Sequence, residues 1–178
     1  MRVISGTARG RKLDSPAGDS VRPTTDNVKE SMFNIIQFDI PGRRVLDLFA
    51  GSGQLGIECI SRGAREAVFV DSDRESVKLI KNNLKRCGFS AQVITGDAID
   101  YLKACGKFDL IFADPPYDSG LYGKVLNTVE LFDILSDGGI IICESKKETL
   151  FPEMNRPYML KKVYNYGKIK LTVFTKDS

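Results

Sequence analysis

Short apolar runs alternate along this chain with segments whose apolar residues recur at helical spacing. The apolar runs predict strands over residues 44–48, 66–71, 91–95, 108–113 and 139–144. The segments around them predict helices over residues 26–37, 54–62, 74–87, 98–104 and 121–135. Apolar strands that alternate with amphipathic helices are typical of βαβ units, in which helices cover both faces of a parallel sheet.

The C-terminal part of the chain has a different pattern. Residues 158–166 and 168–175 both have the composition of strands, and only Gly167 separates them. Because so short a connection joins only antiparallel neighbours, we expect an antiparallel strand at the C-terminal end of the sheet. The whole pattern predicts an α/β fold with a mostly parallel, seven-stranded sheet and a short basic extension at the N-terminus.

Size and composition favour a single soluble domain. The 178 residues are 42% hydrophobic and 28% charged, which is enough to form a proper core. The longest apolar runs, such as Gly139 to Cys143, are too short to span a bilayer, and the first residues lack the apolar block of a signal peptide. We therefore expect a cytoplasmic protein with no membrane partner.

Histidine and cysteine usage narrows the possible chemistry. The chain has no histidine, and its four cysteines form no CxxC pair. These features argue against a zinc site, a redox motif and any mechanism in which histidine activates serine or cysteine. We expect no metal, so the chemistry should use carboxylates, backbone groups or a bound cofactor.

Positive charge is concentrated at the start of the chain, although the net charge is only +3. Asp14 and Asp19 are the only acidic residues among the first basic ones, which are Arg2, Arg9, Arg11, Lys12 and Arg22. Such an arm can contact the phosphates of a nucleic acid, or it can be a solvated loop. Charge alone favours neither interpretation.

A glycine-rich turn follows the first predicted strand. Gly51, Gly53 and Gly56 satisfy the pattern GxGxxG where strand 44–48 passes into helix 54–62. Glycine permits positive φ and close approach of a ligand, and open parallel sheets bind ligands beyond the carboxyl ends of their strands. The turn predicts a ligand site without naming the ligand, because dinucleotide enzymes share the pattern. The phosphate-binding pattern GxxxxGK[ST] is absent from the sequence.

Carboxylates lie at the ends of three predicted strands. Asp47 and Asp71 end the first and second strands, and Asp97 follows the third. A ring of carboxylates would repel the pyrophosphate of a dinucleotide, whereas it would attract a cationic sulfonium that is joined to an adenosine. A helix N-cap is the alternative role for each residue. We prefer it for Asp73, and we prefer ligand binding for Asp71 and Asp97.

The tetrapeptide Asp114-Pro115-Pro116-Tyr117 follows strand 108–113. Its prolines fix φ and would hold the Asp114 carboxylate and the Pro115 carbonyl at the strand end. Two rigid acceptors can bind both hydrogens of an exocyclic amine and stabilise the positive charge that develops during methyl transfer. The Tyr117 ring offers a stacking surface for a base. A merely stiff turn is the alternative, but the glycine turn and the acidic residues upstream favour the functional interpretation.

These motifs carry a resemblance to a known family. Residues 47–53 (DLFAGSG) and 114–117 (DPPY) resemble the signatures of amino-methyltransferases. The start of the chain (MRVISG, then RGRKL), followed by RPTTD at 22–26 and ESMFN at 30–34, resembles the RsmD family. Members of that family are bacterial enzymes that methylate N2 of a guanine in 16S ribosomal RNA. The resemblance covers essentially the whole chain, and RPTTD is its most family-specific part.

The resemblance implies a Rossmann-like class I fold and S-adenosylmethionine as methyl donor. Because no cysteine lies in either motif, we expect direct in-line transfer without a covalent enzyme intermediate. At the cofactor we expect Asp47, Phe49, Ala50, Gly51, Gly53, Asp71, Asp97 and Ala98. The residues expected at the target base are Asp114, Pro115, Pro116 and Tyr117. The residues expected to contact the rest of the RNA are Arg2, Arg9, Arg11, Lys12, Arg22 and Thr24. Residues 1–24 would form an RNA-contacting arm and residues 25–178 the methyltransferase domain. The expected partner is 16S ribosomal RNA in a small-subunit assembly particle.

Three other functions stay open at this point. A DNA adenine or cytosine amino-methyltransferase would use the same Asp-Pro-Pro-Tyr, although such enzymes usually carry an added target-recognition segment. A nicotinamide-dependent oxidoreductase would explain GxGxxG but not Asp-Pro-Pro-Tyr. An RNA-binding module without catalytic activity would leave both motifs without a purpose.

Overall fold

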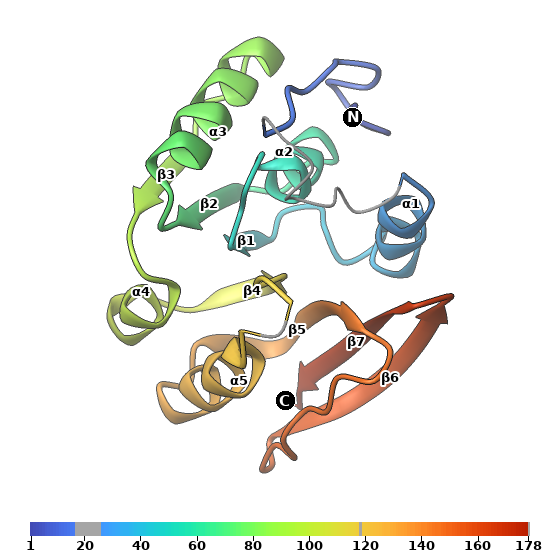
Figure 1. Cartoon of the computed structure of the whole chain (residues 1–178), viewed down its shortest axis with the longest axis vertical. Coiled ribbons are helices and arrows are strands. Elements are labelled where there is room, and N and C mark those ends of the chain that lie inside the picture. Colours follow the sequence, from blue (N-terminus) through green and yellow to red (C-terminus); the bar gives the residue numbers. More distant parts are fainter. Residues whose placement is uncertain (17–25, 118, 178) are drawn as a thin grey trace.

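A seven-stranded sheet with helices on both faces forms the body of the protein (Figure 1). The computed structural model describes residues 1–16, 26–117 and 119–177. The strands are β1 (Arg44–Leu48), β2 (Glu66–Asp71), β3 (Gln92–Thr95), β4 (Phe108–Ala113), β5 (Leu135–Lys146), β6 (Tyr158–Tyr166) and β7 (Ile169–Lys176). The helices are α1 (Asp26–Ile35), α2 (Gln54–Ser61), α3 (Arg74–Cys87), α4 (Ala98–Ala104) and α5 (Leu121–Leu131).

The strand order is β3-β2-β1-β4-β5-β7-β6. The first five strands of this order pair in parallel, whereas β7 pairs antiparallel with both β5 and β6. The mostly parallel sheet with an antiparallel C-terminal strand is therefore confirmed.

Each face of the sheet buries its own apolar core. Helices α1, α2 and α3 cover one face, and α4 and α5 cover the other (Figure 1). Because side chains alternate along a strand, Val45 packs into the first core and its neighbour Leu46 into the second. Among the described helices, none is long and apolar enough to cross a membrane.

Several predicted limits differ from the structure by one or two residues, and the largest differences lie at the end of α5 and the start of β5. The helix expected over residues 121–135 ends at Leu131, and β5 begins at Leu135 instead of residue 139. Asp133 adopts a positive φ of 49°, which ends helical geometry, and the Phe108 N–H then donates to the Ile134 carbonyl at 2.9 Å. The apolar residues at 131–135 continue the helical spacing, so the sequence pattern alone extends the helix to residue 135. Pairing of Leu135 with Phe108 of β4 ends the helix earlier.

The first sixteen residues pack against the body of the protein. They form a hairpin in which Arg2 and Lys12 pair antiparallel, and its residues Val3, Ala8 and Leu13 are buried in the first core. These contacts place the described part of the basic extension over α2 and α3 (Figure 1).

A buried carboxylate joins this hairpin to two helices. Glu58 of α2 accepts hydrogen bonds from the Ile4 and Ser5 N–H groups at 2.8 and 2.9 Å. Its two oxygens also lie 3.4 Å from Lys29 Nζ of α1 and 2.8 Å from Arg62 Nε. Since an unpaired buried charge is costly, these four partners stabilise the Glu58 carboxylate in the core. We call Glu58 and these four partners the Glu58 node.

Candidate active site

The glycine turn and the Asp-Pro-Pro-Tyr turn leave the sheet side by side. Strands β1 and β4 are parallel neighbours, and Leu48 at the end of β1 pairs with Ala113 at the end of β4. The strand order reverses between these two strands, so both turns lie at the topological switch point where open α/β sheets bind ligands. The structure thus brings together the two motifs that the sequence singled out.

Left-handed backbone conformations shape the glycine turn. Phe49, Gly51 and Gly53 have φ angles of 59°, 56° and 76°. A Cβ added at Gly51 would meet only the Phe49 carbonyl, at 4.0 Å, so this side of the turn is open to a ligand. The Gly51 N–H donates to Asp71 Oδ2 at 2.8 Å, which fixes the turn against the end of β2.

The buried side chain of Asp47 holds the backbone of the glycine turn by a hydrogen bond. It is only 2% exposed, and its Oδ2 accepts the Gly56 N–H at 2.8 Å. Burial raises the pKa of Asp47 to about 7, although the Gly56 bond opposes the shift. The third glycine of the pattern serves packing, because a Cβ at Gly56 would lie 2.3 Å from the Phe69 ring. These contacts make Asp47 and Gly56 supports of the loop.

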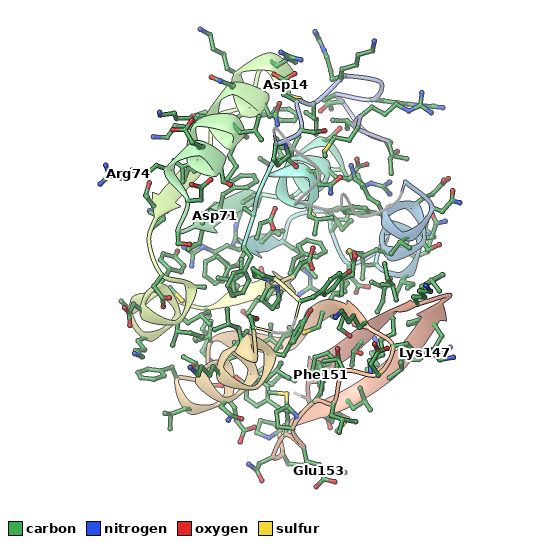
Figure 2. The ribbon with its side chains drawn as sticks, in the orientation of Figure 1. Asp14, Asp71, Arg74, Lys147, Phe151 and Glu153 are labelled. Atoms are coloured by element: carbon green, nitrogen blue, oxygen red, sulfur yellow. The ribbon has the colours of Figure 1, made fainter. Side chains whose placement is uncertain are left out.

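Asp71 lies at the carboxyl end of β2 next to the glycine turn (Figure 2). Its two oxygens accept the Gly51 and Asp73 N–H groups, at 2.8 and 2.9 Å, and the side chain is partly exposed. A carboxylate has about four acceptor positions, so two backbone bonds leave capacity for hydroxyl groups of a ligand.

Two other carboxylates cap helices. Asp73 accepts the Ser76 N–H at 2.8 Å at the start of α3, so the predicted N-cap is confirmed. Asp97 accepts two N–H groups of α4 through Oδ1, at 2.8 and 3.0 Å, and is exposed. The second oxygen of Asp97 takes no part in this cap, so capping and ligand binding are compatible there. Ala98 is the buried first residue of α4.

The Asp-Pro-Pro-Tyr turn places a carboxyl group in a poorly hydrated, acidic environment. Asp114 and Tyr117 are partly exposed, Pro115 is buried and Pro116 is exposed. Burial of its carboxyl, and then the negative charges of Glu144 and Asp47, raise the pKa of Asp114 well above its usual value. A carboxylate with a raised pKa is a better hydrogen-bond and proton acceptor than an ordinary one.

Two residues beside this turn were not predicted from the sequence. Glu144 is 4% exposed, and its Oε1 lies 3.4 Å from the Tyr117 hydroxyl. Tyr122 of α5 is also buried, and its hydroxyl donates to the Glu144 carbonyl at 2.6 Å. Glu144 follows the apolar run of β5, so the strand-end argument that selected Asp47 and Asp71 could have found it. Tyr122 has no comparable sequence signal.

The expected RNA-contacting residues are only partly within the described chain. Arg2, Arg9, Arg11 and Lys12 are all exposed on the N-terminal hairpin, whereas Arg22 and Thr24 lie outside the described residues. Buried Asn83 anchors the exit of this hairpin next to the glycine turn, because its side chain donates to the Asp14 and Ser52 carbonyls at 3.1 and 2.9 Å.

The described part of the chain contains no disulfide and no cluster of metal-ligating side chains. All four cysteines are free thiols, and Cys59 and Cys143 are buried. Within residues 1–16, 26–117 and 119–177, no group of three or more His, Cys, Asp or Glu side chains is arranged to hold a metal ion.

Comparison with known proteins identifies relatives over the whole length of the chain. The sequence matches the family described as Conserved hypothetical protein 95 over residues 1–175. It is 41% identical to YlbH of Bacillus subtilis (strain 168) over 182 residues, which cover 99% of both proteins. It is also 34% identical to Ribosomal RNA small subunit methyltransferase D of Escherichia coli (strain K12), over 100% of this chain and 91% of that protein.

Solved structures agree with these matches. The structure of yhhF from Escherichia coli superposes with a TM-score of 0.90 at 32% identity, over 99% of this chain and 98% of that one. SMU.776, which was solved complexed with SAH, has the same fold with a TM-score of 0.68 at 18% identity, over 82% of this chain and 48% of that one. The methyltransferase fold expected from the sequence is therefore confirmed, and the chain belongs to the RsmD family, the one described as Conserved hypothetical protein 95.

Proposed function

We propose that this protein transfers a methyl group from S-adenosylmethionine to the exocyclic N2 amine of a guanine in 16S ribosomal RNA. One observation carries the proposal. The glycine turn and the Asp114–Tyr117 turn follow the carboxyl ends of β1 and β4, which are adjacent parallel strands. Family membership and the name of the Escherichia coli relative support ribosomal RNA as the substrate class.

The residues around the glycine turn fit S-adenosylmethionine. Gly51 is open to a ligand, and Asp71 keeps acceptor capacity for ribose hydroxyls. The second oxygen of the exposed residue Asp97, together with Ala98, is suited to the adenine edge. Phe49, Ala50 and Gly53 complete the proposed cofactor set. The bound cofactor supplies an electrophilic methyl group on a cationic sulfonium, and a cation there favours the ionised forms of Asp47 and Asp114.

Asp114 and Pro115 are the proposed acceptors for the two amine hydrogens. An exocyclic amine is a poor nucleophile, because its lone pair is delocalised into the ring of the base. Two acceptors favour the pyramidal nitrogen and stabilise its developing positive charge. The raised pKa of Asp114 suits it to take the proton that leaves the nitrogen after transfer. Pro116 keeps the turn rigid, and Tyr117 supplies a ring on which the guanine can stack.

The substrate base must be accessible to this site. A guanine in a loop or a distorted segment reaches it more easily than one inside a duplex, so folded ribosomal RNA in a small-subunit assembly particle is the proposed partner. Residues 1–24 are the proposed RNA-contacting arm, with Arg22 and Thr24 near the mouth of the pocket and the exposed Arg2, Arg9, Arg11 and Lys12 on phosphates. Residues 25–178 are the proposed methyltransferase domain, and a cytoplasmic location stays a prediction.

A methyl-transfer assay tests the proposal directly. The purified protein is incubated with labelled S-adenosylmethionine and, side by side, naked 16S ribosomal RNA, small-subunit particles from cells that lack the gene, and duplex DNA. We expect label in the ribosomal RNA samples, with faster transfer to the particles. Transfer to DNA alone would favour a DNA amino-methyltransferase, and absence of cofactor binding would favour an RNA-binding module without catalytic activity.

A further inference from the structure

A basic hairpin adjoins the proposed target-base site. Residues 158–170, which form β6, the turn after it and the start of β7, contain four lysines and no acidic residue. The end of β5 lies beside this hairpin, because the Lys147 N–H donates to the Lys168 carbonyl at 2.9 Å. Figure 2 shows Lys147 near the tip of the hairpin. Positive charge from two distant stretches of sequence therefore meets there.

The surface is continuous with Tyr117. Lys146 Nζ lies 5.8 Å from the centroid of the Tyr117 ring. Lys146 is also paired across the sheet with Ile169, which is paired in turn with Tyr166. Cross-strand partners point to the same face, and neighbouring strands are roughly 5 Å apart. Tyr166 therefore lies on the same face as Lys146, about 10 Å from it across two strand spacings.

The outer strand adds an alternation of basic and aromatic residues on the same face. Lys162, Tyr164 and Tyr166 occupy every second position of β6, so their side chains share one face. Lys162 Nζ lies 4.9 Å from the centroid of the Tyr164 ring. Lys162 and Lys168 are exposed and the two tyrosines are partly exposed. We call Lys146, Lys162, Tyr164 and Tyr166, together with Lys168 of the adjoining turn, the lysine–tyrosine face.

We propose that the lysine–tyrosine face binds the single-stranded RNA that flanks the target guanine. This inference rests on the proposed function, since it extends the substrate path outward from Tyr117. Lysines neutralise phosphates with release of counterions, and half-exposed aromatic rings stack on bases regardless of sequence. The N-terminal hairpin and the β6–β7 hairpin lie on opposite sides of β1 and β4 (Figure 1), so RNA would be held on both sides of the flipped base.

Protection of a sheet edge is the competing explanation for these lysines. β6 is an edge strand, and charged residues on edge strands prevent pairing with other molecules. That explanation accounts for Lys161 and Lys162, which lie along the edge. It does not account for two half-exposed tyrosines on one face, or for a lysine placed over Tyr117.

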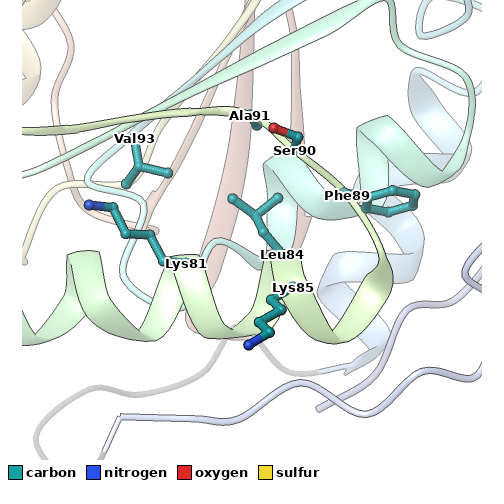
Figure 3. Close-up of a pocket in the computed structure, with 7 residues that line it drawn as sticks. All are labelled: Lys81, Leu84, Lys85, Phe89, Ser90, Ala91 and Val93. Carbon is teal, nitrogen blue, oxygen red and sulfur yellow. The ribbon is translucent and has the colours of Figure 1, made fainter.

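The double variant Lys162→Ala/Lys168→Ala tests the proposal. Its matched control is Lys81→Ala/Lys85→Ala, which removes two exposed lysines from the groove between α3 and β3 at the opposite edge of the sheet (Figure 3). Methyl transfer to 16S ribosomal RNA is measured over a range of salt concentrations, together with binding of S-adenosylmethionine. At about 0.1 M salt, we expect the KM for RNA to rise roughly tenfold to thirtyfold in the test variant with kcat unchanged.

The salt dependence gives a second readout. Loss of two phosphate contacts to single-stranded RNA should reduce the slope of log affinity against log salt by about 1.4. The control should keep the wild-type slope, and both variants should bind the cofactor normally. An unchanged KM and slope in the test variant, or an equal change in the control, would overturn the proposal. If the wild-type protein itself transfers no methyl group to ribosomal RNA, the proposed function fails instead.

The aromatic part of the face needs its own variant. Tyr166→Leu keeps an apolar side chain against the core but removes the ring, whereas Tyr166→Phe keeps the ring. Loss of one stacked base should raise the KM for RNA roughly fivefold to 150-fold in the leucine variant, and the phenylalanine variant should resemble the wild type. Equal KM values in both variants would contradict base stacking on Tyr166.

Discussion

Phe49 adopts a backbone conformation that large side chains rarely adopt. Its φ of 59° lies in the left-handed region, which costs a non-glycine residue roughly 1–3 kcal/mol. Its side chain packs against the core of the α4 and α5 face, so tertiary contacts hold the strained turn in place. Such strain is concentrated at ligand sites, and at Phe49 it directs the chain into the open turn at Gly51.

Asp114 is the residue on which the proposed chemistry depends most. Asp114→Asn keeps the shape of the side chain but replaces one acceptor oxygen by an NH₂ group and cannot take up the amine proton, so we expect kcat to fall about 10²- to 10³-fold. Binding of S-adenosylmethionine should be nearly unchanged, because the proposed cofactor contacts come from other residues. Single-turnover assays and a binding titration on one preparation measure both quantities. Asp100→Asn, at an exposed position of α4, is the control and should retain full activity. Near-normal turnover by Asp114→Asn would remove Asp114 from the mechanism.

At the scale of elements, substitution of two helical glycines by alanine should change the free energy of unfolding in opposite directions. Gly56 of α2 faces the buried Phe69 ring, and a Cβ there would be 2.3 Å from it. We expect Gly56→Ala to lower the free energy of unfolding by about 1–3 kcal/mol through overpacking. Gly123 of α5 has no atom within 4 Å of an added Cβ, so Gly123→Ala should raise that energy by about 1 kcal/mol through helix propensity. Urea denaturation of both variants measures the difference, and equal effects would contradict this packing argument.

The Glu58 node predicts that the N-terminal hairpin contributes to folding stability. Glu58→Gln leaves Lys29 and Arg62 without their carboxylate partner, so we expect unfolding to require about 3 kcal/mol less free energy. Glu66→Gln removes a carboxylate of similar size that is 41% exposed and pairs with Arg44, and it should cost less than about 1 kcal/mol. Thermal or urea unfolding compares the two. A small loss in Glu58→Gln would mean that the node contributes little to stability.

Most elements could be predicted because one local signal determined each of them. Strand β1 and helix α3 have the predicted limits, since an apolar run or an N-cap with a terminal glycine defines them. The end of α5 could not be predicted, because pairing of Leu135 with Phe108 overrides the helical spacing of residues 131–135. The Glu58 node was also not predicted, since three of its partners, Ile4, Ser5 and Lys29, lie 29 to 54 residues from Glu58 in the chain.

At the scale of the whole molecule, the candidate site could likewise be predicted only in part from the sequence. Strand-end position predicted that the glycine turn and Asp114 would meet, because parallel strands end at the same edge. It did not predict that Asp47 would be buried beneath the loop, or that Glu144 would lie beside Tyr117. Those placements depend on which face of the sheet each side chain occupies and on the packing above it. The hairpin that carries the lysine–tyrosine face was predicted as strands, but its closeness to Tyr117 required the tertiary structure.

Folding stability should depend on pH through the buried carboxyl group of Asp47. Its pKa is about 7 in the folded protein and near the ordinary 3.8 when unfolded, so between these values only the folded state keeps the proton. Stability is therefore highest at the acidic end of this window and falls as pH rises, by on the order of 2–3 kcal/mol between pH 5 and 8. No histidine titrates in that range.

Urea denaturation across this pH range measures the effect, with Asp47→Asn as the comparison. The amide can still accept the Gly56 N–H, but it does not titrate. We expect a shallower decline of stability with pH in the variant, and a residual decline from the raised pKa of Asp114. If the stability of the two proteins changed identically with pH, Asp47 would be ionised throughout this pH range, which would contradict the prediction.

Nucleoside mass spectrometry tests the central claim most directly. Small-subunit particles from cells that lack the gene are incubated with the purified protein and S-adenosylmethionine carrying a deuterated methyl group, and their 16S ribosomal RNA is digested to nucleosides. We expect deuterated N2-methylguanosine with the wild-type protein and almost none with Asp114→Asn. Deuterium in a cytosine or adenine nucleoside, or equal N2-methylguanosine with both proteins, would contradict it.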